Sequence, residues 1–402
     1  MRPLSLLDLL EEPAVWADFI RYKSSLACPK QFVRALETFV SEERWRPVCA
    51  RIRAGEPFPL PRKSIISKLS TQKKRVVYTY PEDENAVLKL LTHLLLRRYD
   101  GAFDPNLWSF RPGRTAKDAL RMLLRTKDLP SLWSYKVDVS NYFNSIPLPR
   151  LIPMLETLLE DDPALLAFLR SLLEEPEVLD GDQRVTEQKG IMAGTPLSAF
   201  YANVYLRALD HRFAEAGVPY ARYSDDIILF APTKEACERY AGEVRSFLRD
   251  CGLGVNEDKE VFSAPEDGWT FLGFSWQSGV VDIAPATVKK LKGKMRRKSR
   301  ALMRWAGRNE LEPEKAARAF IRVFDRKLLD APADNELSWS RWFFPVITTD
   351  KSLREIDRYA QDCLRFLLSG KRTKARFNVR YEDLKSLGYR SLVHEYYGFE
   401  KE

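Results

Sequence analysis

Apolar residues recur every three to four positions over much of the chain, which is the spacing of amphipathic helices. This spacing predicts helices in most of residues 1–60, over 85–99, and in two pieces across 149–175. It also predicts a helix over 234–252 and mainly helical structure from residue 289 onward. Helices are therefore expected to dominate both ends of the chain.

Shorter segments rich in β-branched and aromatic residues predict strands. Residues 71–81 are expected to form a strand or hairpin, and the segment 133–146 begins as a strand. Residues 219–232 are apolar around a polar centre, which is typical of a hairpin, and short strands follow in 253–264 and 269–276. From the second of these segments onward, strands alternate with helices in an order that fits an α+β sheet domain of the split βαβ type.

Two loops are expected to lead into helices. The segment 109–125 reads as a loop followed by a helix that starts near Thr115. The segment 190–217 reads as a glycine-rich loop followed by one long helix.

Positive charge is concentrated in one predicted helix. The chain has 402 residues, which indicates two or three domains, and a net charge of +9. The segment 289–308 alone holds ten Lys and Arg and no acid. A solvated helix face would explain this run, but the interleaved apolar residues give the helix one side to pack, and we favour a helix that neutralises phosphates. The apolar residues are Leu291, Met295, Leu302 and Trp305, and the candidate nucleic-acid contacts are Lys289, Lys290, Arg296, Arg297 and Arg300.

Several classes of protein are not expected. Five scattered cysteines and three distant histidines do not indicate a structural zinc site. The strongest apolar stretch, 88–96, is short and carries Lys89 and His93, so a membrane span is not expected. Acidic residues soon after the N-terminus disfavour a secretory signal. We therefore expect a reduced, cytoplasmic protein without a membrane partner.

Carboxylates stand in two apolar segments where packing alone would not favour them. Asp138 lies in the segment 135–139, and Asp225 and Asp226 are adjacent between Tyr223 and an apolar run. Taken separately, a strand-end cap and a hairpin tip would explain them. If the two strands are neighbours, three carboxylates converge and need cations to be stable. Oxygen ligands favour Mg²⁺ or Mn²⁺ over zinc, and a pair of such ions serves in-line phosphoryl transfer.

The segment YSDD (223–226) resembles the Tyr-x-Asp-Asp signature of reverse transcriptases. Other segments resemble further motifs of that family and stand in the family's order. Two resemble fingers motifs of group II intron and other bacterial reverse transcriptases, and four resemble palm motifs A, B, D and E. The fingers segments are KKRVVYTYP (73–81) and SFRPGR (109–114), and the palm segments are DVSNYFNSI (138–146), AGTPLSAFYANVYL (193–206), GLGVNEDK (252–259) and FLGF (271–274).

The resemblance implies the fold of a right-hand polymerase. This fold is α+β, with fingers, a palm that contains an antiparallel sheet, and a helical thumb. On this basis we assign N-terminal helices and fingers to residues 1–135, and the palm, with fingers contributions, to 136–276. A helical, basic thumb and a C-terminal tail are assigned to 277–402.

The resemblance also implies roles for individual residues. Asp138, Asp225 and Asp226 would hold two Mg²⁺ ions, for which Mn²⁺ can substitute. Lys259 would protonate the leaving pyrophosphate. Phe143 would exclude the 2′-hydroxyl of a ribonucleotide, and core packing is the alternative for this ring. Lys74 and Arg75 would clamp the triphosphate, and Arg111 and Arg114 would hold the template strand. A solvated basic surface is the alternative for these Lys and Arg residues. Gly194, Pro196 and Ser198 would shape the loop along the template and the incoming base.

Two positions depart from the family pattern, and the C-terminal part of the chain resembles one particular group within the family. Ala193 stands where many relatives have Gln, and Ser224 where many have Ala, which leaves fidelity and primer preference open. The segment 381–397 resembles the tail of bacterial defence-associated reverse transcriptases of the second class, formerly an unknown group. This resemblance implies a partner non-coding RNA as template, deoxynucleotides as substrates, complementary DNA as product, repeated copying and a role against phage.

Other interpretations stay open. The chain can be a group II intron-like or retron-like reverse transcriptase without a defence role, an RNA polymerase or template-independent polymerase, or an RNA-binding protein with a vestigial polymerase core. The primer is open as well. Ser391, Tyr396 and Tyr397 are candidate hydroxyls by position, and a ribose 2′-hydroxyl of the RNA is another. The sequence does not indicate protein partners.

Overall fold

The chain divides into two compact units. The division lies between Pro265 and Glu266. The assignment of fingers, palm and thumb with boundaries at residues 135 and 276 stays a prediction. A computed structural model describes residues 4–26, 28–67, 74–330 and 339–399.

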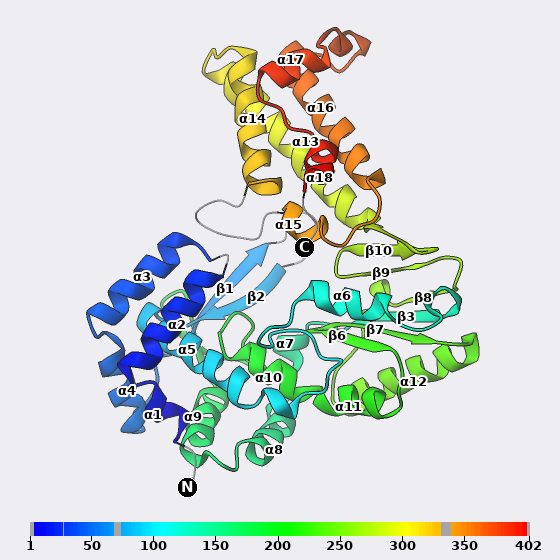
Figure 1. Ribbon diagram of the computed structural model, residues 1–402. Helices are drawn as coiled ribbons and strands as arrows, with labels where there is room; N and C mark the ends of the chain where they lie inside the picture. The colour runs from blue at the N-terminus through cyan, green and yellow to red at the C-terminus, as the bar shows by residue number, and fades with distance from the viewer. Residues whose placement is uncertain (1–3, 27, 68–73, 331–338, 400–402) are drawn as a thin grey trace. The chain divides into compact units, whose positions relative to one another are not determined.

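Unit 1 combines helices with two sheets (Figure 1). The predicted helices in its first 60 residues, over 85–99, across 149–175 and over 234–252 are confirmed. The helices are α1 Leu6–Leu9, α2 Pro13–Ser25, α3 Lys30–Ser41, α4 Trp45–Arg53, α5 Glu82–Arg98, α6 Ala116–Leu124, α7 Tyr142–Ser145, α8 Leu148–Leu158, α9 Pro163–Glu174, α10 Ser198–Tyr205, α11 Arg207–Glu215 and α12 Lys234–Asp250, and the strands are β1 Arg62–Ser67, β2 Lys74–Thr79, β3 Trp133–Asp138, β4 Glu177–Asp180, β5 Gln183–Thr186, β6 Tyr220–Tyr223, β7 Asp226–Ala231 and β8 Val261–Ser263.

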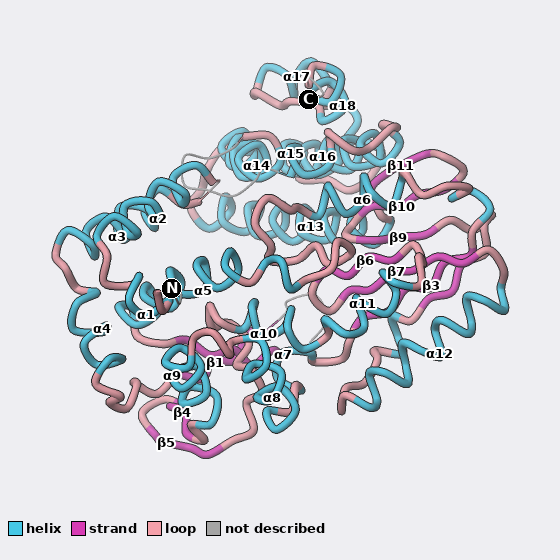
Figure 2. The backbone as a smooth tube through the Cα atoms, turned by 60° about the horizontal axis from the view of Figure 1, so that its bottom comes forward, coloured by secondary structure: helices cyan, strands magenta, loops and turns pink. Residues whose placement is uncertain are grey.

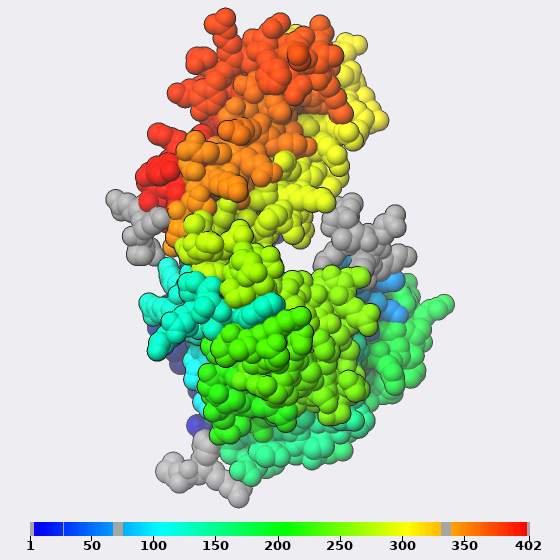
Figure 3. Space-filling model, turned by 90° about the vertical axis from the view of Figure 1, so that its right-hand side faces the viewer, coloured from blue at the N-terminus to red at the C-terminus, as the bar shows by residue number. Residues whose placement is uncertain are grey.

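One sheet of unit 1 is antiparallel and has the strand order β6-β7-β3-β8. Figure 2 shows β6, β7 and β3 side by side. The predicted hairpin in 219–232 is confirmed as β6 and β7. Tyr135 and Val137 of β3 and the inner residues of β7 are fully buried, because helix α12 packs on both strands. In the space-filling view, the green segment that contains α12 covers much of this side of unit 1 (Figure 3).

A second sheet of unit 1 has the strand order β2-β1-β4-β5. β1 and β2 pair in antiparallel register, and the residues between them, 68–73, lie outside the described part. β1 also pairs with β4 in parallel, and β4 and β5 form a hairpin around Gly181. The strand expected in 71–81 is confirmed by β2, whereas β1, β4 and β5 were not predicted. Their exposed, charged positions do not carry the apolar pattern by which strands are recognised.

The long helix expected within 190–217 is instead two helices. α10 ends at Tyr205, and Leu206 has φ −104° and ψ 11°, which are not helical values. α11 then begins at Arg207 and runs in a new direction. The prediction of one helix was wrong because both segments carry helical apolar spacing, which does not mark the break at the fully buried Leu206.

Unit 2 begins with a three-stranded antiparallel sheet of order β11-β10-β9 and continues with helices. Helix α13 packs against α14 and α16, and its apolar side, which includes Leu291 and Met295, is buried as predicted. The prediction that Trp305 belongs to this packed side was wrong, because Trp305 is 43% exposed. The elements are β9 Trp269–Phe271, β10 Phe274–Gln277, β11 Val280–Ile283, α13 Pro285–Arg308, α14 Pro313–Leu328, α15 Trp339–Phe343, α16 Lys351–Ser369, α17 Tyr381–Ser386 and α18 Leu392–Tyr397.

The five cysteines are free thiols in different environments. Cys28, between α2 and α3, is partly exposed, and the other four are buried. Burial raises the pKa of the Cys49 thiol to about 12 and that of the Cys237 and Cys363 thiols to about 11. Within the described ranges, no helix is both long and apolar enough to span a bilayer.

Candidate active site

Three acidic side chains gather at one end of the β6-β7-β3-β8 sheet. In the antiparallel register, Asp138 at the end of β3 lies opposite Asp226 at the start of β7. Asp225 lies in the turn between β6 and β7, and its carbonyl oxygen accepts a hydrogen bond from the Val139 N–H at 3.0 Å. The expectation that the two acidic segments belong to neighbouring strands is therefore confirmed.

The carboxylates in this cluster oppose one another electrostatically. Burial raises the pKa of the Asp225 carboxyl, and the nearby charge of Asp138 raises it further. Burial also raises the pKa of Asp226, although Lys136, whose Nζ lies 3.5 Å from Asp226 Oδ1, opposes the shift. Added positive charge would stabilise such a cluster. Among the described residues, no three acidic, His or Cys side chains already surround a common point, so the fit to metal ions rests on the donor chemistry.

Lys259 lies at the acidic cluster. It belongs to a short 3-10 turn, Glu257–Lys259, and its Nζ is 2.7 Å from Asp138 Oδ2. The N–H of Asn256 donates a hydrogen bond to the Asp138 carbonyl at 2.8 Å, which connects the turn to the end of β3. Half of the Lys259 side chain is exposed, so its ammonium group is accessible from solvent. Its role as a general acid stays a prediction.

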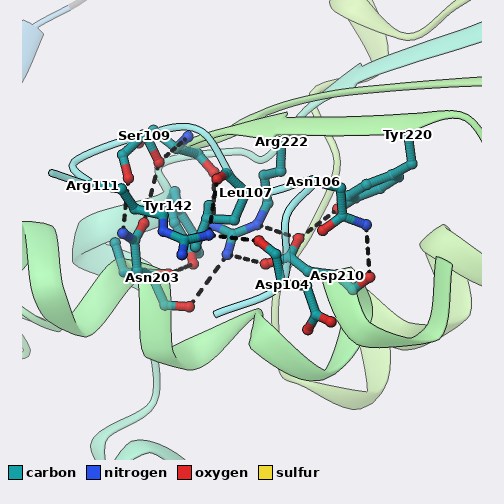
Figure 4. Close-up of polar contacts among 12 residues, drawn as sticks. Asp104, Asn106, Leu107, Ser109, Arg111, Tyr142, Asn203, Asp210, Tyr220 and Arg222 are labelled. Atoms are coloured by element: carbon teal, nitrogen blue, oxygen red, sulfur yellow. Dashed lines mark hydrogen bonds and ion pairs between the residues drawn. The ribbon is translucent and has the colours of Figure 1, made fainter. Parts of the chain in front are cut away.

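A fully buried ion pair supports the turn that carries Asp225. Arg222 on β6 binds Asp210 on α11, with Nη2 2.5 Å from Oδ2 and Nε 2.8 Å from Oδ1. Both side chains are at most 1% exposed. Figure 4 shows the Arg222 side chain reaching toward Asp210 and Asn203. The guanidinium also donates to the carbonyl oxygens of Ser224 at 3.3 Å and Asn203 at 3.2 Å.

Ser224 adopts a left-handed backbone conformation, with φ +61°. This conformation is uncommon for residues other than Gly, Asn and Asp, so surrounding contacts have to hold it. The Ser224 N–H donates to Ser109 Oγ at 2.9 Å, and that hydroxyl donates to Asn203 Oδ1 at 3.2 Å. Asn203 Nδ2 donates to the Ser109 carbonyl at 2.9 Å, and both residues are fully buried. The segments 109–114 and 193–206 therefore meet at the acidic turn.

The residues of this network were not singled out by sequence analysis. Arg222 nevertheless carried a signal, because it is a charged residue in the short strand that precedes the acidic turn. The same kind of signal pointed to Asp138. Ser109 and Asn203 carried no such signal, since small polar residues are common both in loops and in buried helix faces.

We predict that Ser109→Ala lowers the rate of nucleotide incorporation about tenfold, which corresponds to about 1.4 kcal/mol. The substitution leaves the buried Ser224 N–H without its acceptor, so the acidic turn loses one of the contacts that fix it. Steady-state incorporation is the measurement. Ser134→Ala, at a buried serine on β3, is the matched control. Equal rates for both variants would contradict a positioning role for Ser109.

Asn144 connects segments around the predicted nucleotide site. Its Oδ1 accepts a hydrogen bond from the Ala193 N–H at 3.0 Å, and its Nδ2 donates to the Val76 carbonyl at 3.1 Å. Gly194 follows with φ +101°, and a Cβ at this position would lie 3.0 Å from the Tyr78 carbonyl oxygen. A larger residue would therefore push the loop away from β2. Asn144 was not singled out from the sequence.

Phe143 and the start of α10 complete this region. The Phe143 ring is half-buried and makes an edge contact with Tyr142 at 5.6 Å between centroids. Ser198 is buried and donates to the Thr195 carbonyl at 2.7 Å, so its hydroxyl serves the first turn of the helix. Pro196 is half-buried in the same loop. The gate and loop-shaping roles of these residues stay predictions.

The predicted template contacts differ in their surroundings. Arg111 is buried, and its Nε donates to the Asp100 carboxylate at 2.7 Å while Nη1 donates to the Asp104 carbonyl at 2.6 Å. This guanidinium is therefore engaged inside the fold. Arg114 is half-buried and donates to the Pro105 carbonyl at 2.6 Å. Contact of either arginine with a template strand stays a prediction, and the geometry of Arg111 favours a structural role.

The remaining predicted cations lie on two surfaces, one in each unit. Arg75 is exposed on β2, opposite Ile66 of β1. Lys74 is the first residue of β2, and its side chain lies outside the described part. On helix α13, all five predicted nucleic-acid contacts are exposed, namely Lys289, Lys290, Arg296, Arg297 and Arg300.

The candidate primer hydroxyls of unit 2 are not equally accessible. Tyr396 is buried and donates to the Ile347 carbonyl at 2.9 Å. Ser391 donates to Asp357 Oδ2 at 2.6 Å and caps α18. Tyr397 is 69% exposed, the most exposed residue of the three, and its hydroxyl donates to Asp350 Oδ2 at 3.1 Å.

A family comparison agrees with the site geometry. A family model described as "Reverse transcriptase (RNA-dependent DNA polymerase)" matches residues 63–276, which is just over half of the chain. The matched region contains all three carboxylates of the acidic cluster. The chain therefore belongs to the reverse transcriptase family.

Similarity to individual proteins is more distant. A protein of Schizosaccharomyces pombe described as an uncharacterized 91 kDa protein in a cob intron is 28% identical over 149 residues, which is 37% of this chain and 18% of that protein. The chain thus spans less than a fifth of that relative. The structure of apo telomerase from Candida tropicalis has a TM-score of 0.48 and 13% identity, and the match covers 82% of this chain and 69% of that chain. The structure of telomerase from Candida albicans with a TWJ fragment of telomeric RNA has a TM-score of 0.46 and 14% identity, and the match covers 90% of this chain and 69% of that chain.

Proposed function

We propose that the protein is an RNA-directed DNA polymerase whose Asp138, Asp225 and Asp226 hold two Mg²⁺ ions. The observation that carries this proposal is the meeting of three carboxylates at the end of the β3–β7 pair, inside the region that matches the family. Their oxygens are the ligands that Mg²⁺ prefers, and their mutual repulsion favours a bound cation. When bound, two such ions activate the attacking hydroxyl and stabilise the leaving oxygen.

The chain's own residues would act around the reacting phosphate. Lys259 Nζ lies beside Asp138 and would deliver a proton to the leaving pyrophosphate. Arg75 is exposed and would reach a triphosphate as a bidentate donor. Gly194, held close to β2, would let the backbone approach the incoming base.

Primer extension on a defined RNA template tests the activity directly. The purified protein is given Mg²⁺, a DNA primer and either deoxynucleotides or ribonucleotides, and the products are sequenced. DNA complementary to the RNA is expected, and it should be absent with the variant Asp225→Ala/Asp226→Ala. Products that ignore the template would favour a template-independent polymerase. Preferred use of ribonucleotides would favour an RNA polymerase.

We predict that Phe143→Ala admits ribonucleotides. The family's gate excludes a 2′-hydroxyl by bulk, and an alanine leaves room for that oxygen. The ratio of kcat/KM for deoxynucleotides and ribonucleotides should fall on the order of a hundredfold, or about 3 kcal/mol of discrimination. Phe143→Tyr keeps the ring and is the control. An unchanged ratio in Phe143→Ala would assign the ring to core packing.

We predict that the basic face of α13 contributes to RNA binding. Replacing its five candidate contacts by glutamine should weaken binding and reduce the slope of log K against log salt by up to about 3.5 units on single-stranded RNA. The pair Arg296→Gln/Arg297→Gln should account for about 1.4 of these units. Lys371→Gln/Lys374→Gln, at exposed positions after α16, is the charge-matched control. An unchanged slope in the five-residue variant would mean that this face does not contact phosphates.

The finer part of the proposal concerns lineage and partner. The resemblance of segment 381–397 to defence-associated reverse transcriptases of the second class supports a dedicated non-coding RNA, repeated copying and a role against phage. The test is to purify the protein with RNA expressed from its native locus and to sequence both the bound RNA and any DNA made. One enriched RNA with a matching repeated copy is expected. DNA synthesis without such an RNA would favour an intron-like or retron-like enzyme, and RNA binding without synthesis would favour a vestigial core.

A further inference from the structure

A cavity of about 330 Å³ opens between helices α2 and α5 in unit 1. We refer to it as the α2–α5 pocket. Its wall includes Lys23 from α2, and Lys89 and Arg97 from α5. The exposed ring of Phe110 lines it as well, and Pro196, from the loop before α10, closes another side. The pocket therefore borders two segments of the candidate active site without containing any residue of the acidic cluster.

The charge of the α2–α5 pocket is positive and largely uncompensated. No Asp or Glu is among the residues that line it. Arg111 is also part of the wall, but the Asp100 carboxylate neutralises it. In the part of the chain that the structure describes, Lys23, Lys89 and Arg97 have no carboxylate oxygen within 4 Å. Glu82, which does not line the pocket, raises the pKa of Lys89 by less than Lys23 lowers it. Three cations therefore face a common space whose wall contains no carboxylate.

The cations in the pocket act on one another and on a neighbouring histidine. Burial lowers the pKa of Lys89, and the charge of Lys23 lowers it further. Burial, Arg97 and Lys23 lower the pKa of His93 to about 4, so this ring is neutral at pH 7. Arg97 Nη1 lies 2.8 Å from His93 Nδ1, which fits a neutral ring that accepts the hydrogen bond. An anion placed among these side chains would relieve the repulsion.

Aromatic rings interleave with the cations. The Arg97 guanidinium lies 4.5 Å from the centroid of Tyr22, and Lys89 Nζ lies 4.5 Å from that of Phe32. These contacts offset part of the charge, but they are weak compared with an ion pair. Phe110 is 39% exposed and sits at φ +58°, a backbone conformation that is rare for a bulky residue. Its ring is held at the pocket as a surface on which a planar group can stack.

We propose that the α2–α5 pocket binds a phosphodiester of single-stranded RNA, with an adjacent unpaired base stacked on Phe110. Cations that track the backbone, combined with exposed aromatic rings, are the combination by which proteins bind single strands without reading sequence. The proposed function supplies the reason for RNA as the occupant, because the pocket borders the loop that would lie along the template. The binding itself is measurable without catalysis.

The experiment measures binding of a fluorescent single-stranded RNA by anisotropy over a range of salt concentrations, with the full chain and no nucleotides. Lys23→Gln/Lys89→Gln keeps side-chain length and removes two charges. We expect about tenfold weaker binding and a salt slope reduced by about 1.4 units. Phe110→Leu should weaken binding without changing the slope, because stacking releases no counterions. Arg239→Gln/Arg249→Gln on α12, at exposed positions outside the pocket, is the charge-matched control and should bind as the unmodified protein does.

Two results would overturn the proposal. In the first, the lysine variant keeps the affinity and slope of the unmodified protein. In the second, the α12 control loses as much affinity as the lysine variant, which would mean diffuse attraction to net charge. Thermal melting of each variant shows whether it is folded, and Phe110→Leu tests the pocket if the lysine variant is not. Primer extension with saturating RNA tests the polymerase proposal separately from the pocket proposal. DNA synthesis without RNA binding in the α2–α5 pocket would support the first and overturn the second.

Discussion

Asp225→Asn and Asp226→Asn are each expected to reduce nucleotide incorporation by at least about a thousandfold while raising the melting temperature. Under the proposed function each of these carboxylates would hold a metal ion, and its loss would remove charge stabilisation of the reacting phosphate, which is worth several kcal/mol. Stability should move the other way. Burial and the charge of Asp138 raise the pKa of Asp225 in the folded protein, so its ionised form is less favourable there than in the unfolded chain. An amide of the same shape removes that repulsion.

The measurement pairs primer extension with thermal melting at neutral pH and without added divalent ions. Glu257→Gln, at an exposed acid two residues before Lys259, is the control and should change neither quantity. A titration with Mg²⁺ adds a second comparison, because Mg²⁺ should raise the melting temperature of the unmodified protein more than that of either variant. Near-normal nucleotide incorporation in both variants would show that the acidic cluster takes no part in the reaction.

Arg222→Met is expected to lower the free energy of unfolding by about 3–5 kcal/mol, which is the usual cost of leaving a buried charge without its partner. Burial lowers the pKa of the Arg222 guanidinium, but the Asp210 carboxylate raises it by more, so the pair stays charged in the folded protein. Methionine fills a similar volume and makes none of the hydrogen bonds. The Asp210 carboxylate would then keep Tyr220, whose hydroxyl lies 2.9 Å away, as its side-chain donor.

The double variant Arg222→Met/Asp210→Asn separates stability from positioning. It removes the unpaired charge and should recover most of the lost free energy in urea unfolding. Incorporation should nevertheless stay low, because the Ser224 carbonyl still lacks its donor and the acidic turn is less firmly held. Recovery of stability and activity together would show that Arg222 serves the fold alone.

Local structure was well predicted because few neighbouring residues encode it. Thr115 caps α6 through a reciprocal contact with Asp118, and the predicted helix start near Thr115 is confirmed within one residue. The segment 219–232 shows the apolar alternation of a hairpin and forms one. The sequence also predicted that Asp225 and Asp226 of this hairpin lie next to Asp138, because burying a carboxylate without a partner is costly and therefore indicates a site.

Contacts between distant segments could not be predicted in the same way. Ser109 and Ser224 are 115 residues apart, and nothing near either one specifies the other. A family motif also does not say which way a side chain faces. Arg111 lies in such a motif, yet the structure turns its guanidinium toward Asp100. Residue identity predicts which chemistry is available, whereas direction depends on packing across the whole unit.

The thiols described above make the protein suitable for selective chemical labelling. A thiol reacts as its thiolate, and burial disfavours both that form and the approach of a reagent. Cys49, Cys237, Cys251 and Cys363 are buried, which leaves Cys28 as the partly exposed thiol. A maleimide dye should therefore attach at one position without any cysteine being removed. Because Cys28 lies close enough to Lys89 to affect its pKa, that dye would report on events at the N-terminal helices in real time.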